Sequence, residues 1–229
     1  MKSIKYIIAA LIAVSLTVKS NATVTVSWGT ASDSYISDSG GAADDVNQLA
    51  PGDLLELGTW GATQPTLTSG NIQSELSSFS VFASGSFNGG GTFGLVTPAT
   101  ASPTFDGKQI VIIAYNQATS TVSPTPGVTE VAVFYENAAD VSAWLMPADS
   151  PTASTLVDVG DLFVNGGAGN AGAMAAGATI LWGASAYDSP NNLSLIDSAP
   201  VIAVPEPSSI VLVVMGLLGG IGMIRRRRS

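Results

Sequence analysis

The stretches KQIVIIAYN (residues 108–116) and TEVAVFYEN (residues 129–137) decide the fold of this chain. Both are rich in β-branched and aromatic residues, which favour strands. In each stretch consecutive residues are apolar, so apolar side chains would lie on both faces of the strand instead of alternating with polar ones. Such strands are typical of the centre of a sheet whose two faces are both covered. We therefore expect two neighbouring central strands, joined through residues 117–127 as an antiparallel pair with a long loop.

Shorter strand patterns extend in both directions from this pair. The chain has 25 Gly and 12 Pro, so turns are frequent and the strands between them are short. In residues 69–79, Ile72, Leu76 and Phe79 recur at helical spacing, which predicts one short helix. The sequence thus predicts an all-β fold with one short helix, a β-sandwich of the jelly-roll or immunoglobulin-like type. The remaining strand patterns occur at residues 23–28, 53–60, 91–97, 155–159, 179–187 and 193–197.

Charges are unevenly distributed along the chain. Its 8 Lys and Arg residues include three lysines near the start and four arginines at 225–228, which leaves Lys108 alone between them. Of the 17 Asp and Glu residues only Glu206 belongs to the tail, so the middle carries 16 acids against one lysine, a net charge of −15. Such a segment repels nucleic acid and anionic lipid. Divalent cations and neutral sugars are the partners that this charge favours.

The chain contains no Cys and no His. This composition excludes disulfides, thiolate nucleophiles, Ser-His-Asp triads and the usual zinc sites. Charged residues make up 11% of the chain, against about 25% in an average soluble domain. Uncharged polar residues and glycine must therefore make up most of the hydrated surface.

The N-terminal residues 1–22, MKSIKYIIAALIAVSLTVKSNA, have the three parts of a secretory signal peptide. Lys2 and Lys5 precede a short apolar core, and the small residues Ser20 and Ala22 occupy the −3 and −1 positions. We predict cleavage by signal peptidase after Ala22. A retained membrane anchor is the alternative, for which the apolar core is short.

The C-terminal residues combine an apolar run with a basic end. Residues 210–224 are 15 uncharged residues, mostly apolar, and would form a helix about 22 Å long. This predicts a short transmembrane helix, slightly shorter than a hydrocarbon core of about 30 Å. The arginines that follow act as a stop signal and stay on the cytoplasmic side. They are Arg225, Arg226, Arg227 and Arg228.

An extended junction precedes this helix. Pro205 and Pro207 fix their own φ angles and push Val204 and Glu206 toward extended conformations. An extended backbone is what a protease or transpeptidase needs in its active site. The chain therefore divides into a signal peptide (1–22), an exported acidic domain (23–203) and a sorting signal (204–229).

The order Val204-Pro205-Glu206-Pro207, short apolar helix and arginine cluster resembles the PEP-CTERM sorting signal of Gram-negative bacteria. The resemblance implies processing by an exosortase, an integral-membrane cysteine transpeptidase or protease. It also implies a precursor anchored in the inner membrane and a mature form at the cell surface or outside the cell. Proteins with this signal are linked to extracellular polysaccharide and biofilm matrix.

One acidic loop is a candidate calcium site. The stretch DSYISDSGGAADD brings Asp33, Asp38, Asp44 and Asp45 into a glycine-rich turn, and Ca²⁺ takes several oxygen ligands. The spacing does not match an EF-hand loop, because Tyr35 and Ser37 occupy two of its ligand positions. A solvated acidic loop is the alternative, and no other cofactor is predicted.

A catalytic role is not expected from the carboxylates. Glu130 and Glu136 lie six residues apart on one strand, which separates them by about 20 Å. Glycosidases need about 5 to 9.5 Å between their carboxyls. Aromatic residues, among them Trp28, Trp60 and Trp144, offer stacking platforms for sugars, with core packing as the alternative.

Together these features predict an exported protein with a structural or interaction role in exopolysaccharide or biofilm matrix, and not an enzyme. A carbohydrate-binding module is the alternative. A glycan-active enzyme is the third hypothesis.

Overall fold

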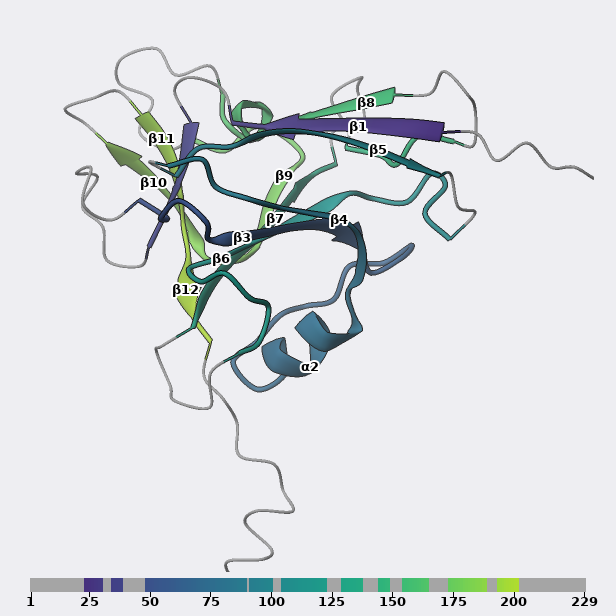
Figure 1. The fold of residues 1–229 in the computed structure, drawn as a ribbon. Helices are drawn as coiled ribbons and strands as arrows, with labels where there is room; N and C mark the ends of the chain where they lie inside the picture. The colour runs from purple at the N-terminus through teal and green to yellow at the C-terminus, as the bar shows by residue number, and fades with distance from the viewer. Residues whose placement is uncertain are drawn as a thin grey trace, which may run out of the picture.

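The computed structural model describes residues 23–30, 34–38, 48–89, 91–100, 104–122, 129–137, 144–148, 154–164, 173–188 and 193–201. The regular structure in these residues is mainly strands arranged in three sheets, and one α-helix, α2 (Ile72–Ser78), packs against them (Figure 1). The prediction of a β-rich fold with one short helix is confirmed. The predicted signal helix and the predicted C-terminal transmembrane helix fall on residues outside the described ranges. Within the described part, no helix combines the length and apolarity needed to cross a membrane.

The largest sheet is built around the two stretches that decide the fold. Its strand order is β12-β7-β6-β3-β4, and β9 also pairs with β7. β6 is antiparallel to both of its neighbours, with Ile112 opposite Phe134 of β7 and Leu57 of β3. Every residue of β6 is buried, which confirms its central place. The strands are β3 (Leu54–Thr59), β4 (Ser80–Ser86), β6 (Val111–Tyr115), β7 (Glu130–Glu136), β9 (Ala178–Trp182) and β12 (Ala199–Pro200).

Two three-stranded sheets accompany the central one, and each contains a parallel pair. One has the order β5-β1-β8, with β1 parallel to β8, and the other has the order β10-β11-β2, with β11 parallel to β2. In Figure 1 the first lies above the central sheet and α2 lies below it. The bounds are β1 (Thr23–Gly29), β5 (Gly94–Thr100), β8 (Ser154–Asp158), β2 (Ser34–Ser37), β10 (Ala184–Asp188) and β11 (Leu193–Asp197).

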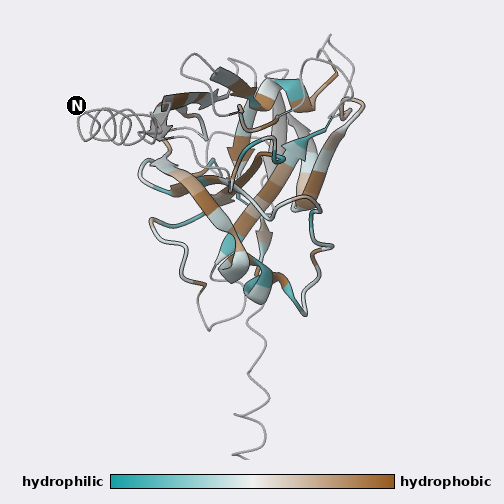
Figure 2. Cartoon of the chain, turned by 90° about the vertical axis from the view of Figure 1, so that its right-hand side faces the viewer, coloured by the Kyte–Doolittle hydropathy of each residue, from teal (hydrophilic) through white to brown (hydrophobic). Residues whose placement is uncertain are grey.

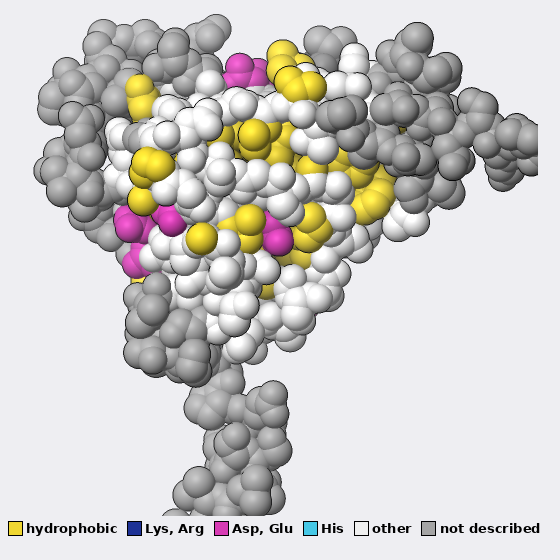
Figure 3. All heavy atoms as spheres, viewed as in Figure 1, with side chains coloured by type: hydrophobic (Ala, Val, Ile, Leu, Met, Phe, Trp, Pro, Cys, Tyr) yellow, Lys and Arg dark blue, Asp and Glu magenta, His cyan; other side chains and the backbone are white. Residues whose placement is uncertain are grey.

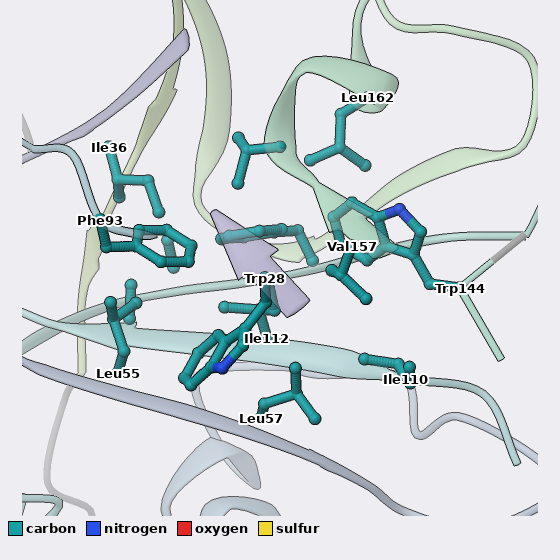
Figure 4. Packing of buried hydrophobic residues seen from close by; sticks show 14 of the residues in the cluster. Trp28, Ile36, Leu55, Leu57, Phe93, Ile110, Ile112, Trp144, Val157 and Leu162 are labelled. Atoms are coloured by element: carbon teal, nitrogen blue, oxygen red, sulfur yellow. The ribbon is translucent and has the colours of Figure 1, made fainter. Parts of the chain in front are cut away.

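The central sheet separates two hydrophobic cores, because its strands contribute apolar side chains to both of its faces. The hydrophobic residues along the strands are coloured brown in Figure 2. On one face Trp28 of β1 and Val157 of β8 pack with Leu57 and Ile112 (Figure 4). On the other face Ile72 and Leu76 of α2 pack with Ile113, Tyr115 and Val133. Complete burial of such side chains contributes about 1.5–3 kcal/mol each, so the two-faced pattern is the main source of stability.

The sequence reading missed several strands. β2 lies inside the acidic stretch treated as a loop, and β4 follows α2 directly. Residues 179–187, expected as one strand, form β9 and β10 on either side of Gly183, whose φ of 106° breaks the strand. β2 has only four residues and β4 is rich in Ser, Gly and Ala. β2 is therefore too short, and β4 too poor in β-branched residues, to be recognised as a strand from its own sequence.

Candidate functional site

A groove lies at one edge of the central sheet, where β3 and β7 end and β6 begins. Because β6 is antiparallel to both neighbours, these three strand ends meet at the same edge. The groove has a volume of about 540 Å³, within the size range of ligand pockets, about 300–1,000 Å³. We call it the strand-end groove. Its lining includes Gln64, Asp106, Lys108, Tyr135, Asn137 and Leu145.

Gln109 ties the floor of the strand-end groove together. Its side-chain Nε2 donates to the carbonyl oxygens of Ile110 (3.1 Å), Glu136 (2.8 Å) and Trp144 (2.9 Å). The Trp144 amide in turn donates to the Glu136 carbonyl at 3.1 Å. One amide thus joins the start of β6, the end of β7 and the segment at 144–148, which fixes the backbone beside Asn137 and Leu145.

A tight turn places two opposite charges in the groove. The Lys108 amide donates to the Phe105 carbonyl at 2.9 Å, and Gly107 has a φ of 63°, which glycine adopts without strain. The Phe105 ring packs edge-on against Phe82, with centroids 5.3 Å apart. The Met146 amide donates to the Lys108 carbonyl at 2.8 Å. The turn is therefore anchored on both sides, and it carries Asp106 and Lys108 among the residues lining the groove.

The opposite wall is formed by the chain that leaves β3. The Gly61 amide donates to the buried Thr59 hydroxyl at 2.9 Å, and Gly61 has a φ of 105°. The Gln64 Nε2 lies 3.5 Å from the Gly61 carbonyl, a long contact. The Gln64 Oε1 is buried and has no hydrogen-bond partner among the described residues.

The groove is electrically balanced although the domain is acidic. Lys108 is the one Lys or Arg within the described ranges, and Asp106 offsets its charge. Among the described side chains visible in Figure 3, acidic groups appear and no Lys or Arg does. The strand-end groove is thus the place where this acidic surface offers a cationic donor.

A second, smaller groove of about 410 Å³ lies beside α2 and contains Glu56. The Tyr115 hydroxyl donates to the Glu56 Oε2 at 3.1 Å. Burial raises the pKa of Glu56, and the Tyr115 hydrogen bond opposes that rise. Among the described residues that line this groove no second carboxyl is present, so the pair needed by a glycosidase is not assembled there.

The structure describes one of the four aspartates of the predicted calcium site. Asp33, Asp44 and Asp45 lie outside the described residues, and Asp38 follows β2. Burial, followed by the nearby Glu130 carboxylate, raises the pKa of Asp38 to about 6. The Ser198 hydroxyl donates to Glu130 Oε2 at 3.0 Å. Within the described residues no three acidic side chains gather as a metal centre, and calcium binding stays a prediction.

The tryptophans are packing residues. Trp28 and Trp144 are buried in the first core, and Trp60 and Trp182 pack against the second. The indole N–H groups of Trp60 and Trp182 donate to the carbonyls of Glu75 (2.8 Å) and Ala199 (3.0 Å). The core-packing alternative therefore holds for them. Glu130 and Glu136 begin and end β7, as expected.

The strand-end groove was missed by sequence reasoning. Its lining residues come from three segments far apart in the chain, around 61–64, 106–109 and 135–145. A weak signal existed, because Lys108 opens one central strand stretch and Asn137 closes the other. Polar residues at the ends of antiparallel neighbours lie at the same edge only if the pairing is known.

Comparisons with known proteins bear on the tail. Residues 203–228 match the family model of the PEP-CTERM protein-sorting motif. No curated protein and no solved structure matches the chain significantly. The predicted sorting signal is thus confirmed as a motif, and the motif implies export and an anchored precursor processed by an exosortase. Val204, Pro205, Glu206, Pro207 and the four arginines lie outside the described residues.

Proposed function

We propose that this chain is a non-catalytic protein of the extracellular polysaccharide matrix, delivered there by exosortase sorting. The match of residues 203–228 to the PEP-CTERM motif carries the proposal. In this proposal signal peptidase removes residues 1–22, and the tail holds the precursor in the inner membrane until the exosortase acts. The mature acidic domain is then released or attached outside the cell.

Several features support a structural or interaction role over catalysis. The chain has no His and no Cys, and the groove with Glu56 offers a single carboxyl among its described lining. A charge of −15 between the two ends disfavours nucleic acid as a partner and leaves neutral polymers unopposed.

The packing of β1 and β8 over β3, β6 and β7 supports a β-sandwich for the exported domain. The parallel pairs β1–β8 and β11–β2 differ from the all-antiparallel sheets of jelly-roll and immunoglobulin-like folds. A carbohydrate-binding module is the second candidate function. It is favoured by the strand-end groove, whose lining is mainly polar and includes a tyrosine.

The test combines mass spectrometry with fractionation. We expect the mature surface form to lack residues Arg225 to Ser229, and we expect it to co-purify with the cell's extracted polysaccharide. Recovery of the surface form with those residues attached would contradict sorting by cleavage. A processed protein that is recovered entirely free of polysaccharide would leave sorting intact and refute the matrix role.

A further inference from the structure

We infer that the strand-end groove binds a neutral saccharide chain. This inference rests on the matrix role proposed above and names the site and the class of ligand. Its position at three strand ends places the groove on a rigid scaffold.

The chemistry of the lining fits a polyol. Each sugar hydroxyl both donates and accepts hydrogen bonds, so a saccharide site must offer both kinds of group. Lys108 supplies donors and Asp106 supplies acceptors, while the Asn137 amide and the Tyr135 hydroxyl supply both. Gln64 also lines the groove and carries a side-chain amide, a group that both donates and accepts.

The apolar part of the lining is small. The ring of half-buried Tyr135 and the side chain of Leu145, which is 43% exposed, can cover the C–H face of one sugar ring. Drug-like and peptide-anchoring pockets are mostly apolar, with few polar groups. The strand-end groove has the opposite balance, which favours a hydroxyl-rich ligand over an apolar peptide.

The charge distribution selects a neutral saccharide over an acidic one. The opposite charges of Asp106 and Lys108 offset each other within the groove, and the rest of the domain carries 15 further acidic residues. A polyuronate would be repelled over its length by this field. A neutral glucan or mannan meets no such opposition.

The scaffold is preorganised for binding. Gln109 holds the strand ends through three carbonyls, and the turn with Asp106 and Lys108 is anchored by Phe105 and Met146. A rigid site loses little conformational entropy when it takes up a ligand. Gln109 therefore supports the backbone of this site.

The test is affinity electrophoresis of the purified mature protein through gels that contain dextran, galactomannan or alginate. We expect retardation by at least one of the neutral polymers and no dependence on salt. Asp106→Ala and Asn137→Ala should each raise the dissociation constant about tenfold, the effect of losing one well-placed hydrogen bond. Gln73→Ala and Asn88→Ala, exposed amides outside the groove, should leave it unchanged.

Three results would overturn the inference. Retardation that Asp106→Ala and Asn137→Ala leave intact would place binding elsewhere, without affecting the proposed matrix role. Preferential binding of alginate that falls with salt and disappears in Lys108→Met would assign the groove to acidic saccharides instead. A protein that co-purifies with the cell's polysaccharide yet is retarded by no neutral polymer would keep the matrix role and remove the groove as its neutral-saccharide site.

Discussion

Asp38 shows how a single carboxyl couples the stability of this domain to pH. It follows β2, and it lies close to Glu130 at the start of β7 and to Ser198, which precedes β12. Burial, the Glu130 carboxylate and the more distant Asp53 all raise its pKa, from an ordinary value of 3.8 to about 6. The Ser198 hydroxyl acts in the opposite direction. Among the described residues, Glu130 and Asp53 are the titratable groups that shift the pKa of Asp38.

Asp38→Asn should flatten the pH dependence of stability. Between about pH 4 and pH 6 the native state keeps a proton on Asp38 that the unfolded state has lost. The native state then binds more protons, so the wild-type free energy of unfolding falls as the pH rises through this window. The asparagine side chain stays neutral and can still donate to Glu130. Thermal melts from pH 4 to pH 7 should show the wild type losing more melting temperature than the variant.

A charge-matched variant isolates this effect. Glu75→Gln removes one negative charge from α2 and controls for the change in net charge alone. Parallel melting curves for wild type and Asp38→Asn would show that the carboxyl is not perturbed in the folded protein.

At the scale of elements, the apolar stretches were predictable and the polar strands were not. β6 and β7 are identified by their runs of consecutive apolar residues, and α2 is identified by the spacing of Ile72 and Leu76. β4 reads SVFASGS, a sequence with little strand preference of its own. It becomes a strand because β3 offers it a ladder of backbone partners from Leu54 to Thr59. Such a tertiary effect is not encoded in a local window.

Gly58 permits the close approach of β3 and β4. The register between them shifts between Leu57 and Gly58, as in a β-bulge. A Cβ at Gly58 would collide with the Ser80 carbonyl oxygen and would lie 2.9 Å from the Phe79 ring. The backbone carbonyl cannot move aside without disturbing β4, so the glycine is required by space.

Gly58→Ala should destabilise the fold by about 1–3 kcal/mol, the usual range for overpacking. Urea unfolding followed by tryptophan fluorescence would measure the loss, because Trp60 lies in the core beside Phe79, with ring centroids 4.7 Å apart. Gly70→Ala is the matched control, since its added Cβ meets only the Thr68 hydroxyl at 3.8 Å. Equal stability of the two variants would show that the β3–β4 contact is looser than described.

At the scale of the whole molecule, the sorting motif and the strand-end groove differ in how the sequence encodes them. The sorting motif is one contiguous run, so its residues and their order are visible in the sequence. The strand-end groove joins segments that are separated by some 25 to 45 residues and meet only through the pairing of β3, β6 and β7. A long-range pairing pattern is needed before such a site can be recognised, and single-strand periodicity does not supply it.

Because the sorting motif is contiguous, the effect of a mutation in the tail can be predicted from the tail's own residues. Pro205 and Pro207 predict an extended junction, because proline fixes its own φ and restricts the residue before it. The double variant Pro205→Ala with Pro207→Ala removes both restraints, so the predicted helix that follows could extend toward Val204. We expect an unprocessed precursor that keeps Arg225 to Ser229 and stays in the membrane fraction, as seen by mass spectrometry of the fractionated protein.

The neighbouring double variant Ser208→Ala with Ser209→Ala leaves both prolines in place and should mature like the wild type. Neither double variant changes residues 23–203. The melting temperature of this domain should therefore be the same in the unprocessed proline variant and in the mature serine variant. Normal maturation of the proline variant would show that the processing enzyme does not depend on an extended junction. Recognition would then depend on other parts of the tail, such as Glu206, the apolar run or the arginines.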